Sequence, residues 1–192
     1  MRFGRRKITY YDTEAGFEAE KFAARLLLLL MNEMRASGRR QGVFLCIGTD
    51  RSTGDSLGPL IGYKLKQERR RGTLVFGTLD RPVHAMNLEH YVQVLKNGYP
   101  DALVVAVDAS VGDESHIGYV TLGRGALKPG LGVCKELHAV GDLFITGIVA
   151  GCSHYDPMML HAIGVMIGGK KFIILLKLRK IMLLYLCRYF QH

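Results

Sequence analysis

Short apolar runs alternate along the chain with stretches of helical periodicity. Three runs are rich in Val, Ile and Leu and stop at small or polar residues, which is typical of buried strands. They are Gly42–Thr49, Ala102–Val107 and Asp142–Val149. Weaker patterns predict shorter strands at Thr73–Leu79 and Gly118–Leu122. The chain is therefore expected to contain a sheet of five strands.

Helical periodicity predicts helices over Glu14–Arg35, Leu57–Glu68 and Asn87–Asn97. In the third, Asn87 is a plausible N-cap and Gly98 a stop signal. The alternation of strands and helices favours an α/β fold with a mainly parallel sheet. The apolar residues expected to face the core from the first helix are Phe17, Phe22, Leu26, Leu29 and Leu30.

The chain of 192 residues is long enough for one domain with a sizeable core. We divide it into a basic N-terminal arm (1–13), a single α/β domain (14–156) and an apolar, basic tail (157–192). Acidic residues are absent from the tail. Three interpretations of it stay open: a final helix on the sheet, a membrane-surface helix, or an artefact such as a change of reading frame.

Basic residues give the chain a net charge of +9, but the excess lies at its two ends. Residues 8–156 carry 16 basic and 17 acidic side chains. A nucleic-acid partner is therefore not expected, and we interpret the run Arg69-Arg70-Arg71 as a solvated helix end. No membrane contact is expected either, except through the tail.

The four cysteines, Cys46, Cys134, Cys152 and Cys187, form no C-x-x-C pair. A zinc finger or redox motif is thus not indicated. Two of the cysteines lie in apolar, strand-like runs, where reduced, buried thiols are expected, and a reducing cytosol fits. The run Leu26–Met31 follows several charged residues and is too short to span a bilayer, so it is not interpreted as a signal peptide.

Polar residues cluster where the predicted strands end, which is where open α/β sheets bind ligands. One cluster is the loop Asp50–Ser56, a second is Asp108–Ser110, and a third is His138 before the last strand. Each has an ordinary structural alternative: Asp55 as a helix N-cap, Asp108 as a turn residue, and His138 as a surface residue.

Two carboxylates at neighbouring strand ends, Asp55 and Asp108, could share a proton, activate water or hold a divalent ion. His138 would complete a carboxylate–imidazole metal set. The glycine-rich loop could instead bind phosphate at a helix N-terminus. The phosphate-loop, dinucleotide and serine-elbow motifs are absent. No cofactor is indicated beyond a possible divalent metal.

The segments FLCIGTDRSTGDSLGPLIGYKL, VVAVDASVG and AVGDLFITGIV resemble the YyaC-type sporulation proteins of endospore-forming bacteria. That family is similar to the spore germination protease and, more distantly, to the hydrogenase maturation endopeptidases. The resemblance covers about Gly42–Val149, and the sequence departs from the family after about Ala150. It implies a three-layer α/β/α sandwich of the phosphorylase/hydrolase-like kind.

The resemblance also implies roles for particular residues. Asp55 in DSLGP and Asp108 in VDA match proposed catalytic aspartates of the germination protease. His138 matches the histidine of an L-H-x-x-G segment that helps recognise nickel in the hydrogenase maturation enzymes. The residues expected to position the loop around Asp55 are Gly54, Ser56 and Gly58.

The leading hypothesis is a sporulation-associated, peptidase-like protein in which two aspartates activate water against a protein or peptide substrate. The alternative is a non-catalytic spore-assembly or binding module on the same fold. The resemblance implies a cytoplasmic location in the sporulating cell or forespore. The sequence does not indicate an oligomeric state.

Overall fold

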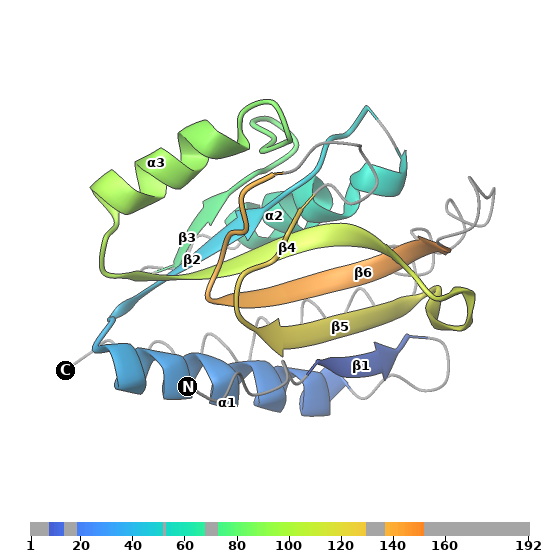
Figure 1. Cartoon of the computed structure of the whole chain (residues 1–192), viewed down its shortest axis with the longest axis horizontal. Helices are drawn as coiled ribbons and strands as arrows, with labels where there is room; N and C mark the ends of the chain where they lie inside the picture. The colour runs from blue at the N-terminus through green and yellow to red at the C-terminus, as the bar shows by residue number, and fades with distance from the viewer. Residues whose placement is uncertain (1–7, 14–18, 52, 68–72, 130–136, 152–192) are drawn as a thin grey trace.

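The computed structural model describes residues 8–13, 19–51, 53–67, 73–129 and 137–151. Its core is a six-stranded sheet in the order β1-β5-β6-β4-β2-β3 (Figure 1). The strands are β1 Thr9–Asp12, β2 Gln41–Cys46, β3 Thr73–Phe76, β4 Ala102–Gly112, β5 Tyr119–Arg124 and β6 Leu143–Gly151. The helices are α1 Ala19–Ser37, α2 Leu57–Gln67 and α3 Leu88–Gly98, with short 3₁₀ turns η1 Thr53–Asp55 and η2 Glu114–His116.

Four adjacent strands, β3, β2, β4 and β6, run parallel. β5 and β1 continue the sheet with antiparallel pairing. The predicted mainly parallel sheet is confirmed. The edge strand β1 was not predicted, because its four residues fall in the assigned N-terminal arm and are too few for a clear alternating pattern.

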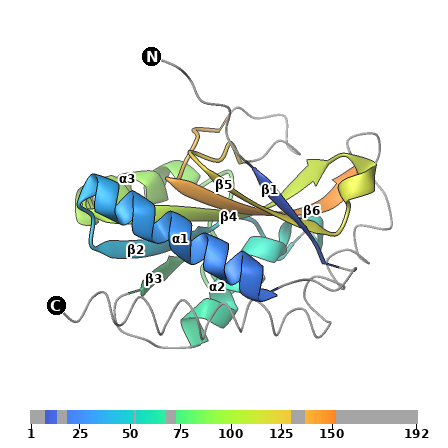
Figure 2. The same ribbon diagram turned by 90° about the horizontal axis from the view of Figure 1, so that it is seen from below.

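Helices cover both faces of the sheet, so the predicted three-layer α/β/α arrangement is confirmed. Residues of α1 and α2 share one buried cluster with one face of the sheet, and residues of α3 share a second cluster with the other face. Figure 2, seen from below, shows α1 running across the sheet in front of the strands, with α3 behind them.

The predicted helices agree closely with the observed ones. Phe22, Leu26, Leu29 and Leu30 are each at most 4% exposed, as expected for the buried face of α1; Phe17 lies outside the described residues. α3 begins directly after Asn87, but no hydrogen bond from the Asn87 side chain caps it.

The strand β4 is longer than the sequence pattern predicts. Ala102–Val107 was expected to end before Asp108, but pairing with β6 continues through Asp108 to Gly112. A polar residue marks a strand end only if it faces water. Here Asp108 is paired with β6 and lies inside the strand. The alternative that Asp108 is a turn residue is therefore wrong.

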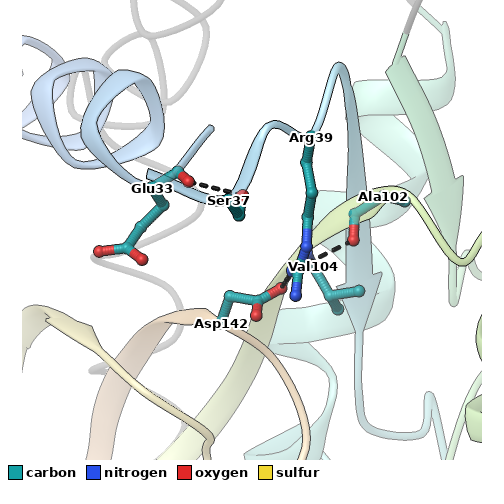
Figure 3. Close-up of polar contacts among 6 residues, drawn as sticks. All are labelled: Glu33, Ser37, Arg39, Ala102, Val104 and Asp142. Carbon is teal, nitrogen blue, oxygen red and sulfur yellow. Dashed lines mark hydrogen bonds and ion pairs between the residues drawn. The ribbon is translucent and has the colours of Figure 1, made fainter. Parts of the chain in front are cut away.

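A polar contact fixes the start of the parallel strands (Figure 3). Arg39, between α1 and β2, donates to Asp142 just before β6, with 2.5 Å between Nη1 and Oδ2. The same Asp142 oxygen accepts a hydrogen bond from the Val104 amide on β4 at 2.9 Å. One carboxylate therefore links the junction before β2 to both β4 and β6.

Several sequence predictions fall outside the described residues, namely the tail 157–192, the run Arg69-Arg70-Arg71 and three of the cysteines. Cys46 is described and is fully buried as a free thiol, as predicted, and burial raises its pKa. Among the described residues, none of the helices has the length and apolar character that a membrane span requires.

Candidate functional site

The candidate site lies just beyond the carboxyl end of β2, beside the interior of the longer neighbouring strand β4. The β2 chain stays beside β4 beyond its last strand residue, because the Ile47 amide donates to the Val107 carbonyl at 2.7 Å. The loop after β2 contains η1, which packs against β4. This packing brings the segment of Asp55 next to the strand that carries Asp108.

Asp55 ends η1 and is half-buried. Its carbonyl accepts the Thr49 amide at 3.1 Å, which closes the loop on itself. Burial raises the pKa of the Asp55 carboxyl, while a hydrogen bond from the Thr49 backbone and the charge of His84 lower it. A carboxyl with a raised pKa is suited to carry a proton in acid–base chemistry.

The N-cap alternative for Asp55 is not what the structure shows. α2 begins at Leu57, so Ser56 is the residue directly before the helix, and the Ser56 carbonyl accepts the Leu60 amide at 3.1 Å. Asp55 lies one residue further out, and its own carbonyl bonds backward to Thr49.

Asp108 is only 4% exposed and lies in the interior of β4. Its register partner on β6 is Thr146, which is in turn the partner of Thr121 on β5. Both threonines are buried, and their hydroxyl oxygens are 2.6 Å apart. Side chains of in-register partners point to one face of a sheet, so Asp108 begins a buried polar row across three strands.

Three residues were expected to position the loop, and each contributes differently. Gly54 is a buried residue of η1, and Ser56 is 8% exposed before the helix. Gly58 lies inside the first turn of α2 rather than in the loop. A Cβ at Gly58 would be 2.0 Å from the Ile47 carbonyl oxygen. Gly58 therefore permits α2 to pack directly on the backbone after β2.

His138 does not join the two aspartates. Its side chain is 83% exposed, and its Nδ1 lies 3.0 Å from Oε2 of Glu89 near the start of α3. Within the described ranges, no three His, Cys, Asp or Glu side chains are grouped to hold a metal ion. The predicted trio of Asp55, Asp108 and His138 is therefore not assembled here, and His138 takes the surface position that was its structural alternative.

A different histidine, His84, lowers the pKa of the Asp55 carboxyl through its charge. His84 lies in the turn between β3 and α3 and was not singled out from the sequence. A local signal for His84 was available in the sequence. The segment PVHAMN, which contains it, follows a predicted strand and precedes a predicted helix. Such a segment lies at the same edge of a parallel sheet as the loop of Asp55.

These features define a class of protein: a three-layer α/β/α domain with one carboxylate in the loop after β2 and a second one buried within the adjacent parallel strand β4. A family model described as "Protein of unknown function (DUF1256)" matches residues 10–167. The chain belongs to this family. It is also similar to "Uncharacterized protein YyaC" of Bacillus subtilis (strain 168), with 46% identity over 127 residues.

That alignment covers 66% of this chain and 62% of the relative, so the chain spans about three fifths of the relative's length. The predicted relationship to YyaC-type proteins is confirmed. The family match extends to residue 167, beyond the departure that the sequence predicted at about Ala150. All six basic residues of the tail follow residue 167.

Proposed function

We propose that the protein is a peptidase-like hydrolase of sporulation in which Asp55 and Asp108 activate water against a peptide bond. The observation that carries this proposal is the packing of η1, which ends at the half-buried Asp55, against the strand that holds Asp108. The resemblance to YyaC-type proteins and to the germination protease supports the same choice of residues.

The chemistry requires one carboxylate to accept a proton and one carboxylic acid to donate one. A carboxylate takes a proton from water as the water oxygen attacks the peptide carbonyl carbon. The acid then protonates the leaving nitrogen as the carbon–nitrogen bond breaks. Asp55 suits the acid role because burial raises its pKa, which leaves Asp108 as the base.

The test incubates the full-length protein with a peptide library and identifies fragments by mass spectrometry. Asp55→Asn and Asp108→Asn should each abolish cleavage, because an amide can neither accept nor donate the proton. Asp50→Asn is the matched control: Asp50 lies in the same loop but is exposed, so cleavage should persist. Unchanged turnover in the Asp55/Asp108 double variant would overturn the proposal.

One observation favours the second candidate, a non-catalytic binding module. Asp108 is 4% exposed, and a base that activates water must be reached by water. The peptide library therefore also serves as a binding assay. Retained peptides without fragments, in the wild-type protein, would favour the module over the hydrolase.

A further inference from the structure

Strand β4 extends further than its neighbour β2 at the candidate site. The pairing of β2 with β4 ends at Cys46 and Val107, whereas β4 stays paired with β6 as far as Gly112. Residues 108–112 therefore form an overhang of β4, which among the described residues has a paired strand on one side only (Figure 1). Residues 105–108 are buried, but residues 109–112 are partly exposed. The overhang thus gives the sheet an edge that solvent reaches.

The backbone groups of β4 point alternately to its two neighbours. The Val104 carbonyl faces β6, because it accepts the amide of Asp142 at 2.8 Å. The Val107 carbonyl faces β2, because it accepts the amide of Ile47 at 2.7 Å. In a parallel sheet, successive residues of one strand bond to opposite sides. Ala109 follows Val107 by two positions, so its N–H and C=O groups point to the β2 side, beyond the end of β2.

The chain that leaves β2 does not continue beside Ala109. Ile47 forms a parallel bridge with Val83, and the Gly48 amide donates to the Val83 carbonyl at 2.7 Å. These contacts direct the chain to the side of β2 that is remote from β4. Within the described ranges, the N–H and C=O groups of Ala109 have no hydrogen-bond partner across this edge. The overhang therefore offers one donor and one acceptor in the geometry of an unpaired strand.

The overhang lies where the strand order of the sheet reverses. The chain that leaves β2 passes through α2 to β3 on one side, and the chain that leaves β4 passes to β5 on the other side. Open α/β sheets bind ligands in the crevice at such a point, outside the carboxyl ends of the strands. η1, which follows β2 and ends at Asp55, packs against β4. A ligand bound at Ala109 would therefore lie at the candidate site.

We propose that an extended peptide segment binds to the overhang as an added strand, with its backbone bonded to the N–H and C=O groups of Ala109. A paired strand bonds to both groups of one residue, so this peptide forms two hydrogen bonds there. An extended peptide fits because its backbone supplies an acceptor and a donor at the matching spacing. That the bound peptide is a substrate rests on the proposed function, whereas the binding itself does not.

The first experiment measures amide hydrogen exchange in the free full-length protein by NMR. The Ala109 amide should exchange about 10-fold faster, or more, than the amide of Asp108, which points to β6 and is protected by the sheet. Equal protection of the two amides would overturn the proposal, because Ala109 would then already have a partner. This result does not depend on whether the protein cleaves peptides.

The second experiment identifies the peptides that the full-length protein retains from a random-peptide library. The peptide with the highest affinity is then synthesised with a methyl group on one backbone nitrogen at a time. Methylation of the nitrogen that donates to Ala109 should lower the affinity about 10-fold. Methylation of the adjacent nitrogens should have little effect, because they point away from β4. A loss without this alternation, or no retained peptide, would overturn the proposal.

The matching change in the protein is Ala109→Pro, which removes the N–H group. It should weaken binding of the same peptide about 10-fold, whereas Ala109→Gly keeps the N–H group and should bind normally. If Ala109→Pro does not fold, the methylated peptides still decide. The alternating pattern without cleavage would support the added strand and refute the hydrolase. Cleavage without the pattern would refute the added strand alone.

Discussion

Thr146 on β6 and Thr121 on β5 share a hydrogen bond between their hydroxyl groups, 2.6 Å apart, in the interior of the protein. Each hydroxyl is the hydrogen-bond partner of the other, and both side chains are at most 5% exposed. The pair lies in register with Asp108, so the polar row that includes a candidate site residue is also part of the core.

The hydroxyl pair predicts non-additive stability changes. Thr146→Val leaves the hydroxyl of Thr121 buried without this partner and should lower the free energy of unfolding by about 1–3 kcal/mol; Thr121→Val should do the same. The double variant should lose less than the sum of the two, because no orphaned hydroxyl is left. Urea unfolding of the four proteins measures this, and additive losses would contradict the coupling.

Arg39 and Asp142 should differ in their contribution to stability. Arg39→Met removes a half-exposed ion pair, which contributes about 0–1 kcal/mol. Asp142→Ala also deprives the Val104 amide of its acceptor and should cost about 1–3 kcal/mol. Chemical denaturation gives both values. The effect of Arg39→Met should shrink at high salt, and an Arg39→Met loss larger than that of Asp142→Ala would be inconsistent with this structure.

Two helical glycines should respond to alanine with opposite sign. Gly58→Ala would place a Cβ 2.0 Å from a backbone oxygen and should destabilise the protein by roughly 1–3 kcal/mol. Gly98→Ala meets no atom within 4 Å and should stabilise it by up to about 1 kcal/mol, because alanine restricts the unfolded chain. Thermal unfolding distinguishes them, and equal shifts in Tm would argue against close packing of α2.

Asp55 should make stability depend on pH with a definite sign. Because its pKa is raised from the ordinary value of 3.8, the folded protein holds this proton to a higher pH than the unfolded chain does. As pH rises through that interval, the Asp55 carboxyl therefore lowers the free energy of unfolding. The loss is complete above the folded-state pKa.

Asp55→Asn removes that titration. The free energy of unfolding of the variant, relative to wild type, should increase between pH 3 and pH 7, as measured by urea denaturation at each pH. Asp50→Asn serves as the exposed control from the same loop. If the free energy of unfolding of the variant, relative to wild type, fell with rising pH instead, the folded state would favour the charged carboxyl of Asp55.

The sequence predicted the fold well because strand and helix patterns report burial directly. Runs such as Ala102–Val107 are apolar on both faces of a covered sheet, and the spacing of Phe22, Leu26 and Leu30 reports one buried helix face. The edge strand Thr9–Asp12 escaped prediction because its pairing with β5 depends on residues more than a hundred positions away.

The site was only partly predictable. The sequence indicated Asp55 and Asp108 as polar residues near strand ends, and the structure places their segments together. The sequence could not show that Asp108 is enclosed within β4, because the neighbouring strands decide where a strand ends. The sequence also indicated His138 as a third site residue, because a motif match carries no information on where the folded chain places a histidine, and the structure places His138 at the surface beside Glu89.

By itself, therefore, the sequence determined the layered α/β architecture, the near-neutral charge of the domain and the two candidate carboxylates. These depend on local pattern and composition. Tertiary structure alone decided which side chains meet, since Thr146 contacts Thr121 on the next strand and Arg39 contacts Asp142, 103 positions further along the chain. Burial of Asp108 likewise comes from strands that pack on either side of it.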